Sequence, residues 1–249
     1  MAGRIYIGTA GWSIPRAAAP HCPASGTHLQ RYARVFDCAE INSSFYRSHG
    51  TATYAKWAGS TDADFRFSVK VPRTITHEQR LRRARVPFAR FLGETSGLGP
   101  HRGPLLVQLP PSLEFEARVA ASFFRLVRSC YDGPVVCEPR HPTWFAADAT
   151  GVLGRFEIAR VVADPAPAPQ ATQPDGWMGV AYFRLHGSPR MYWSRYDADY
   201  VTRLAANVRR LAECSDVWCV FDNTASGAAL ENAWELRNLL RASVAPATP

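Results

Sequence analysis

The stretch Gly179–Gly187 reads GVAYFRLHG and shows, in nine residues, the pattern that decides the fold. It is a short apolar run, and such runs predict buried strands. Successive side chains on a strand point to opposite faces, so Tyr182, Arg184 and His186 share one face. The stretch therefore predicts a strand that ends in polar and ionisable side chains on a single face.

Seven further runs of this kind occur along the chain, separated by helical patterns. Eight strands alternating with helices favour parallel β-α-β units that close into a barrel, and 249 residues agree with the roughly 250 of one (β/α)8 barrel of the TIM type. The predicted strands are Arg4–Gly8, Cys38–Asn42, Phe65–Val71, Pro104–Leu109, Pro134–Glu138, Ala159–Asp164, Val180–His186 and Asp216–Asn223. The predicted helices are Leu29–Phe36, Thr53–Ala58, Phe88–Thr95, Phe115–Ser129, Ala146–Phe156, Ala198–Ala212 and Ala228–Ala242.

One segment interrupts this alternation. Pro165–Trp177 reads PAPAPQATQPDGW, and its prolines forbid a regular helix. We therefore predict an imperfect barrel whose sixth helix is missing or reduced to a turn. The alternative is a doubly wound open sheet, which would normally carry a glycine-rich phosphate turn after its first strand. The segment GTAGW, Gly8–Trp12, does not match that G-x-G-x-x-G pattern.

Composition and termini favour one ordinary globular domain. The chain is 47% hydrophobic and 20% charged, which excludes disorder, and no run approaches the ~18 apolar residues of a membrane span. We find no repeat or linker, so residues 1–249 are predicted to form one domain with a frayed tail at Val244–Pro249. The N-terminal MAGRIYIG passes directly into a strand, which predicts a cytoplasmic protein with no membrane partner.

The charge of the chain favours anionic partners. The net charge is +8, and only Lys56 and Lys70 of the 29 basic residues are lysines. A basic surface attracts phosphates, nucleotides or nucleic acid. The arginine-rich segment from Arg80 to Arg90 is either a solvated helix face or a contact to a phosphate backbone.

The ends of the strands carry the candidate site. Parallel strands bring their carboxyl ends to the same rim of a barrel, where barrel enzymes place their chemistry. Seven of the eight predicted strands end in a polar group, so we expect a functional mouth, although any single residue of this kind is more often a loop edge. The polar residues at these ends are Glu40, Asn42, Lys70, Gln108, Glu138, Arg140, Asp164, Tyr182, Arg184, His186 and Asn223.

These residue types indicate acid–base chemistry on an anion. Guanidinium groups suit carboxylate or phosphate, carboxylates can exchange protons, and histidine titrates near neutrality. Lys70 can act as a base or a Schiff-base nucleophile when desolvated, or it can simply pair with Glu40. The predicted catalytic residues are Glu40, Lys70, Glu138, Asp164 and His186; the predicted substrate-binding residues are Asn42, Tyr46, Gln108, Arg140, His141, Arg184, Asn223, Trp12 and Trp144.

A metal site is weighed but not favoured. Carboxylates, histidine and asparagine at strand ends can bind a divalent cation in a barrel mouth. No local spacing such as H-x-H or H-E-x-x-H is present. We therefore predict no metal ligands and leave the cofactor unknown. Aromatic residues such as Trp12, Tyr46 and Trp144 either stack on a base or sugar or cover the barrel core.

Seven motifs follow one another along nearly the whole chain. They are GTAGW (Gly8–Trp12), EINSSFYR (Glu40–Arg47), FRFSVKVPRTITH (Phe65–His77), LLVQLPPS (Leu105–Ser112), EPRHPTWF (Glu138–Phe145), YFRLHG (Tyr182–Gly187) and FDN (Phe221–Asn223). In these motifs the chain resembles the YecE-like family, the domain-of-unknown-function family numbered seventy-two. The resemblance implies a TIM-type barrel with a polar pocket but no settled reaction. It also implies that the pocket includes Tyr46 and His141 beside the strand-end residues.

Three functions remain open at this point. The first is an enzyme acting on a small anionic substrate, phosphate-bearing or nucleotide-like. The second is a protein that binds or processes nucleic acid, with or without a metal. The third is a non-catalytic binding barrel whose polar ring is mainly structural. The sequence predicts no oligomeric state.

Overall fold

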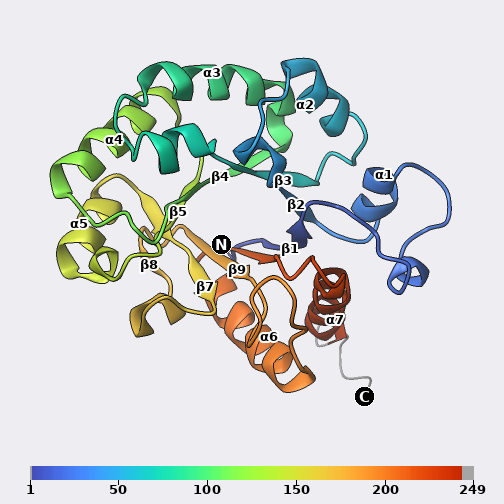
Figure 1. Ribbon diagram of the computed structural model, residues 1–249. Helices are drawn as coiled ribbons and strands as arrows, with labels where there is room; N and C mark the ends of the chain where they lie inside the picture. The colour runs from blue at the N-terminus through green and yellow to red at the C-terminus, as the bar shows by residue number, and fades with distance from the viewer. Residues whose placement is uncertain (1, 243–249) are drawn as a thin grey trace.

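The computed structural model describes residues 2–242 and shows a mixed α/β fold of the TIM-barrel-like kind. A ten-stranded sheet curls so that one of its faces lies on the inside, and helices lie against the outer face (Figure 1). The strand order is β7-β9-β10-β1-β2-β3-β4-β5-β6-β8, and every neighbouring pair is parallel except β6 with β8. The strands are β1 (Ile5–Ala10), β2 (Cys38–Ile41), β3 (Arg66–Lys70), β4 (Arg102–Gln108), β5 (Val135–Glu138), β6 (Ile158–Arg160), β7 (Val162–Asp164), β8 (Asp175–Gly176), β9 (Val180–Leu185) and β10 (Asp216–Phe221).

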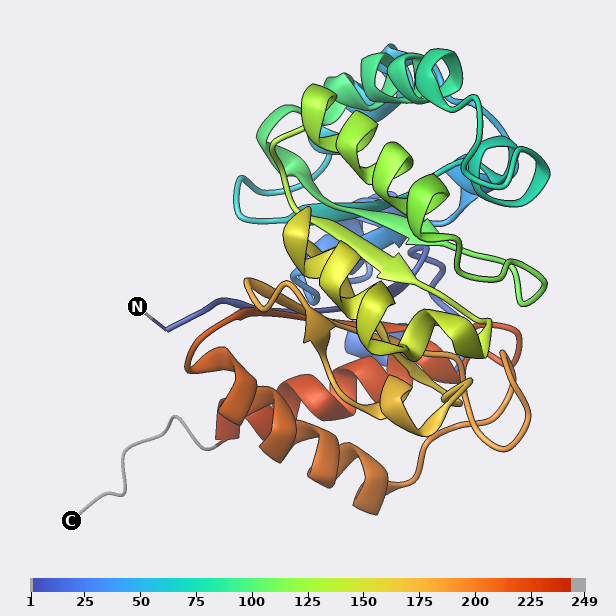
Figure 2. The same cartoon turned by 90° about the vertical axis from the view of Figure 1, so that its left-hand side faces the viewer.

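The helices form where the sequence places apolar residues at helical spacing. In α4, Phe123, Phe124 and Val127 are buried on the face toward the sheet. Figure 2 shows α4 and α5 side by side on the outside of the sheet. The helices are α1 (His28–Ala33), α2 (Thr51–Ala58), α3 (Arg85–Thr95), α4 (Ala117–Cys130), α5 (Ala147–Arg155), α6 (Ala198–Ala212) and α7 (Ala228–Ala242).

The sixth predicted strand is not continuous. It divides into β6, which pairs with β5, and β7, which pairs with β9. Val161 alone separates the two halves, and its backbone N–H donates to the carbonyl of Cys137 at 2.8 Å. The following proline-rich segment contains only the short 3-10 helix Pro169–Thr172 and β8, which agrees with the predicted reduction of a helix at this place.

Apolar side chains form two separate clusters, one on each face of the curled sheet. The larger cluster lies between the sheet and the helices and includes Phe67, Phe123 and Phe221. The smaller cluster includes Tyr182 and Trp218, from strands β9 and β10. Side chains two residues apart on a strand share a face. The inner face therefore continues from this smaller cluster to the residues two positions further along each strand, toward its carboxyl end.

No helix within residues 2–242 is long and apolar enough to cross a bilayer. The predicted frayed tail, Val244–Pro249, lies outside the described residues.

Candidate functional site

The centre of the candidate site is the guanidinium of Arg184, near the carboxyl end of β9. Its Nε donates to Glu40 Oε2 at 2.9 Å and its Nη2 to Glu40 Oε1 at 2.7 Å, so the two side chains form a bidentate pair. Its Nη1 donates to Glu138 Oε2 at 3.1 Å, and Nη2 lies 2.9 Å from Asp222 Oδ2. Arg184 is 1% exposed, so it holds three carboxylates together in the interior.

His186 connects two of these carboxylates. Its Nε2 lies 3.1 Å from Glu138 Oε1 and its Nδ1 lies 3.1 Å from Asp222 Oδ2. Both ring nitrogens therefore face acceptors, an arrangement that suits the imidazolium, in which both nitrogens are donors. Burial opposes the charge, but Glu138 and Asp222 outweigh it and raise the pKa of His186.

Two carboxylates of this network, those of Glu138 and Asp222, are held ionised. Burial alone would raise the pKa of Glu138, yet Arg184, His186 and Arg140 hold it well below the usual range. Burial likewise opposes ionisation of Asp222, and Arg184 and His186 lower its pKa nonetheless. The same carboxylates raise the pKa of Arg184 further, against the effect of its burial. We call Glu40, Glu138, Arg184, His186 and Asp222 the mouth network.

The mouth network rests on hydroxyl groups beneath it. The Tyr182 hydroxyl lies 3.1 Å from Glu40 Oε2 and 2.9 Å from Ser68 Oγ. Tyr182 is two residues before Arg184 on β9, and Ser68 is two residues before Lys70 on β3. Because residues two apart on a strand share a face, the hydroxyl groups lie one step below the charged side chains on the inner face of the sheet. Burial raises the pKa of Tyr182 well above its ordinary value, which keeps its hydroxyl as a donor to Glu40.

Lys70 differs from every other cation of the site. It ends β3 and is 5% exposed, but across residues 2–242 its Nζ has neither an ion pair nor a hydrogen bond to another side chain. Its close contact is the ring of Phe45, with the centroid 4.1 Å from Nζ. Burial, and then the charge of Arg184, lower the pKa of Lys70 to about 8.

Arg140 and Tyr192 form the more open side of the site. Arg140 donates from Nε and Nη2 to Glu138 Oε1, at 3.1 and 3.0 Å, and its Nη2 also donates to the Tyr192 hydroxyl at 3.3 Å. The side chain of Arg140 is 20% exposed and Tyr192 is 40% exposed, whereas Glu138 is enclosed. Part of the Arg140 fork can therefore meet a ligand.

His77 faces the same cations from the segment after β3. Burial, followed by the charges of Lys70, Arg73 and Arg140, lowers its pKa to about 4. Its ring lies edge-on to Phe45, with centroids 4.9 Å apart, and its Nδ1 is 2.9 Å from the Thr76 hydroxyl. His77 is therefore neutral near pH 7, and its pKa is shifted in the opposite direction from that of His186.

The structure brings together six of the predicted site residues and places two more beside them. Gln108 is 7% exposed and lies in register with Glu138 on the neighbouring strand. Asn42 follows Glu40 by two residues, and its buried Oδ1 has no partner among the described residues. The six residues brought together are Glu40, Lys70, Glu138, Arg140, Arg184 and His186.

Two predicted residues point to the opposite face of the sheet. Asp164 accepts from the Tyr196 hydroxyl at 2.8 Å, and Asn223 donates to Asn232 of α7 at 3.0 Å. The alternation continues through the sixth strand, with Ala159 and Val161 in the inner cluster and Val162 in the outer one, so Asp164, two residues after Val162, faces the helices. In β10 the expected face was off by one residue, and Asp222 rather than Asn223 joins the mouth network.

The remaining predicted residues have local structural contacts. His141 accepts from the backbone N–H of Thr143 and so begins a 3-10 helix, and Trp144 is buried with its indole N–H donating to the Leu113 carbonyl at 2.9 Å. Trp12 packs edge-on against Trp57 and Phe67. Tyr46 is 68% exposed and, with Phe45 and Arg73, lines a cavity of about 560 Å³.

Three residues that the structure places at the site are not among the predicted catalytic and substrate-binding residues. They are Asp222, Tyr192 and His77. The alternation of Trp218, Val220 and Asp222 along β10 could have indicated the first. No regular pattern marks the other two, since both lie outside the strands.

The described residues give no support to a metal centre in this network. No group of three or more histidine, cysteine, aspartate or glutamate side chains within residues 2–242 could hold a metal ion. The oxygens of Glu40, Glu138 and Asp222 are already directed at Arg184, Arg140 and His186.

Comparison with known proteins agrees with this architecture. The model of the family described as "Protein of unknown function DUF72" matches residues 6–249. The chain belongs to this family. The Escherichia coli (strain K12) UPF0759 protein YecE is 34% identical over 143 residues, which cover 57% of this chain and 50% of YecE, so the match spans about half the length of that relative.

Two further relatives match over nearly the full length. The Bacillus subtilis (strain 168) UPF0759 protein YunF is 25% identical over 95% of this chain and 94% of its own. The solved structure of a DUF72 family protein from Enterococcus faecalis superposes with a TM-score of 0.81 at 19% identity, covering 95% of each chain. At that identity the superposition supports the fold alone.

Proposed function

We propose that this DUF72 family protein is an enzyme that binds a small anionic substrate at the mouth and transfers a proton through Lys70. The observation that carries the proposal is the pairing pattern. Arg184, His186 and Arg140 each form ion pairs with carboxylates, whereas the enclosed ammonium of Lys70 forms none within residues 2–242 and feels Glu40, Glu138 and Asp222 only from beyond pairing distance. An enclosed cation without a directly paired carboxylate is a site for an anion from solution.

The mouth network then has a positioning role. Arg184 is sequestered by three carboxylates, so we assign it to holding Glu40 and Glu138 in place instead of contacting the substrate. Arg140 is the accessible guanidinium and would contact the anionic group together with Lys70. A phosphate-bearing or nucleotide-like substrate fits these two cations, because phosphate accepts both a guanidinium fork and an ammonium.

Proton transfer falls to Lys70 for a physical reason. A general acid or base is most effective when its pKa lies near the working pH. The Lys70 pKa of about 8 leaves both forms populated at mildly alkaline pH, whereas Glu138 stays ionised because Arg184 and His186 hold its pKa down. His186 is a positioning residue: it lies between Glu138 and Asp222, contacts both and lowers the pKa of each carboxyl group.

Two polar groups would fix the rest of the substrate. The buried Asn42 Oδ1 has no donor among the described residues, and such an acceptor costs free energy unless a ligand or water supplies a donor. Gln108 lies on the strand between those of Lys70 and Glu138. A substrate that carries hydroxyl groups beside its anionic group would satisfy both.

We also propose the finer architecture. Residues 158–164 would act as one interrupted sixth strand that closes an eight-stranded (β/α)8 barrel, and residues 1–249 would form one domain. The pairing of β6 with β5 and of β7 with β9 supports this closure. Free thiols at four buried and two exposed cysteines support a reducing compartment such as the cytoplasm.

The chain offers a matched pair of variants for testing the proposal. Thermal stability would be measured with inorganic phosphate, sugar phosphates and nucleotides for the wild type, Lys70→Met and Lys56→Met. Lys56 is exposed on α2 and is not one of the site residues. A ligand at a hundred times its Kd adds about 2.7 kcal/mol of stability. We expect phosphate-bearing ligands to stabilise the wild type and Lys56→Met but not Lys70→Met; equal responses of all three proteins would contradict the proposal.

The completeness of the mouth network also supports a second candidate, a non-catalytic binding barrel. Every carboxylate of the network is paired, as a structural cluster requires. Ligands found in the thermal screen would be incubated with the wild type and followed by NMR for any chemical change or exchange of hydrogen for solvent deuterium. Binding that depends on Lys70 without either change would favour this second candidate.

A further inference from the structure

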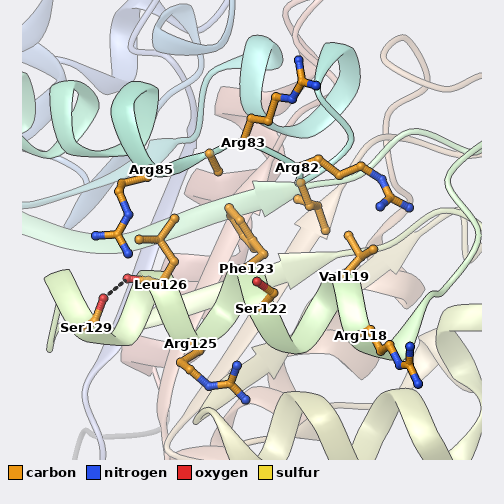
Figure 3. Close-up of a pocket in the computed structure, with 12 residues that line it drawn as sticks. Arg82, Arg83, Arg85, Arg118, Val119, Ser122, Phe123, Arg125, Leu126 and Ser129 are labelled. Carbon is orange, nitrogen blue, oxygen red and sulfur yellow. Dashed lines mark hydrogen bonds between the residues drawn. The ribbon is translucent and has the colours of Figure 1, made fainter.

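A cluster of five arginines lies outside the mouth, in a groove between the segment that leads into α3 and the helix α4 (Figure 3). The groove has a volume of about 690 Å³. Its charged lining residues are all arginines and none is acidic; they are Arg82, Arg83, Arg85, Arg118 and Arg125. We call this the arginine groove. We propose that it binds the phosphodiester backbone of a nucleic-acid strand.

The guanidinium groups of the arginine groove are mostly free of carboxylates. Arg82 pairs with Glu116 at 2.7 Å, with both side chains more than half exposed, and such surface pairs contribute little. Within residues 2–242, the other four arginines have no carboxylate partner; they are Arg83, Arg85, Arg118 and Arg125. Four exposed cations around one concavity attract a polyanion more strongly than they attract a single anion.

The segment before α3 is built to display these charges. Leu81 and Ala84 are buried at 4% and 3% exposure, while Arg82, Arg83 and Arg85 are exposed. Leu81 and Arg83 have φ values of 66° and 52°, in the left-handed region that side chains other than glycine seldom adopt. The strained backbone anchors two apolar side chains while turning the arginines outward.

The opposite side of the groove is one face of α4. Arg118, Ser122, Arg125 and Ser129 follow each other at three- and four-residue spacing, so they form one row along the helix. At 1.5 Å per residue, Arg118 and Arg125 are about 10 Å apart along the axis, which lets them contact different phosphates of one strand. Figure 3 shows Phe123 and Leu126 between this row and the arginines of the other side.

The shape of the groove favours a single strand over a duplex. Proteins usually read a duplex by inserting a projecting helix or ribbon into its groove, whereas single strands are held in basic channels. A concavity of about 690 Å³ has the size of a small-ligand pocket, so it accommodates a few nucleotides. The partly exposed Val119 and Leu126, which lie above the buried Phe123, can contact bases or sugars beside the bound phosphates.

The test uses fluorescence anisotropy with a labelled single-stranded oligonucleotide and the full chain. The groove variant carries Arg118→Ala and Arg125→Ala. The control variant carries Arg34→Ala and Arg203→Ala, which are exposed arginines outside the groove, so both variants fall from a net charge of +8 by two units. Lys70→Met separates this site from the mouth.

We expect wild-type binding that weakens with salt and falls about tenfold or more in the groove variant. The slope of log affinity against log salt should become shallower by about 1.4, because each phosphate contact of a single strand contributes about 0.7. The control variant and Lys70→Met should bind within about twofold of the wild type.

Several results would overturn the proposal. These are undetectable binding at low salt, equal losses in the groove and control variants, and tighter binding of a duplex of the same sequence. Preferential binding to phosphatidylserine vesicles or to a polyglutamate peptide, lost in the groove variant, would assign the groove to a membrane or an acidic protein instead. The mouth proposal stands or falls separately, on Lys70→Met in the thermal screen.

Discussion

The mouth network and the arginine groove use the same cationic side chain in opposite ways. Arg184 is 1% exposed and contacts three carboxylates, whereas Arg118 and Arg125 are exposed and contact none within the described residues. Breaking a buried pair leaves uncompensated charges, while removing a surface arginine leaves only water. The comparison shows that pairing and burial, not residue type, decide whether an arginine organises the fold or is available to a ligand.

The mouth itself contains a second contrast, between Lys70 and its neighbours. Arg140, Arg184 and His186 all face Glu138, and that carboxylate is held ionised by them. Lys70 is 5% exposed but forms no ion pair within the described residues, and its close contact is the face of Phe45. In this site, the cations that stabilise Glu138 are therefore Arg140, Arg184 and His186, and the cation that is available to a ligand is Lys70.

The largest effect is expected from Arg184→Met. It would leave Glu40, Glu138 and Asp222 buried without their common partner, and removing one member of a buried pair typically costs about 3–5 kcal/mol. Urea unfolding would measure the loss. Arg118→Met is the matched control on the exposed side, with an expected change within about 0.5 kcal/mol. Equal losses in the two variants would remove the distinction between the two regions.

A smaller effect of opposite sign is expected from Lys70→Met. The methionine keeps the apolar stem but removes an ammonium that burial destabilises, so the variant should be more stable by about 1 kcal/mol at pH 7. Lys56→Met, on the surface of α2, should be unchanged. Destabilisation by Lys70→Met would show that this lysine is part of the paired network.

The pH dependence of stability should follow His186 above neutrality. Glu138 and Asp222 raise its pKa over the unfolded value of 6.5, so its contribution is complete below about pH 6.5 and is lost as pH rises through the folded pKa. Urea unfolding from pH 6 to 8 should show this decline in the wild type and a weaker one in His186→Gln, because above pH 8 the lowered pKa of Lys70 makes stability rise instead. A steeper decline in the variant would mean that His186 is neutral in the folded protein.

At acid pH, the loss of stability should be governed by protonation of the Glu138 and Asp222 carboxylates. The pKa values of Glu138 and Asp222 are lowered in the folded protein, so their contribution is present above their unfolded pKa values and is lost as pH falls through the folded ones. Unfolding between pH 5 and 2 should therefore be less pH-dependent in Glu138→Gln. An unchanged profile would place the acid sensitivity elsewhere in the molecule.

Much of the fold follows from local patterns in the sequence. All eight predicted strand segments contain strand structure, because short apolar runs between helical patterns specify parallel units. Six predicted site residues converge because the carboxyl ends of parallel strands meet. The errors lie in the choice of face at the ends of two strands. Asp164 shares the outer face with Val162, and in β10 it is Asp222, not Asn223, that continues the inner face of Trp218 and Val220.

Other features could not be read from local patterns at all. Tyr192 and His77 reach the site from segments between strands, where no periodicity defines their direction. The left-handed conformations at Leu81 and Arg83, which shape the arginine groove, are unusual for these residue types. Such positions are set by tertiary packing, which a single sequence does not display.

The most direct test of the central claim is an NMR titration of the two lysines. Protein labelled with ¹³C at lysine Cε gives two signals, since Lys56 and Lys70 are the only lysines, and Lys70→Met assigns them. We predict that Lys70 titrates near pH 8 and that inorganic phosphate moves its midpoint upward, while Lys56 does not respond to phosphate. If Lys70 instead titrates together with Lys56, and phosphate moves neither signal, the mouth holds no available ammonium and the proposed function is wrong.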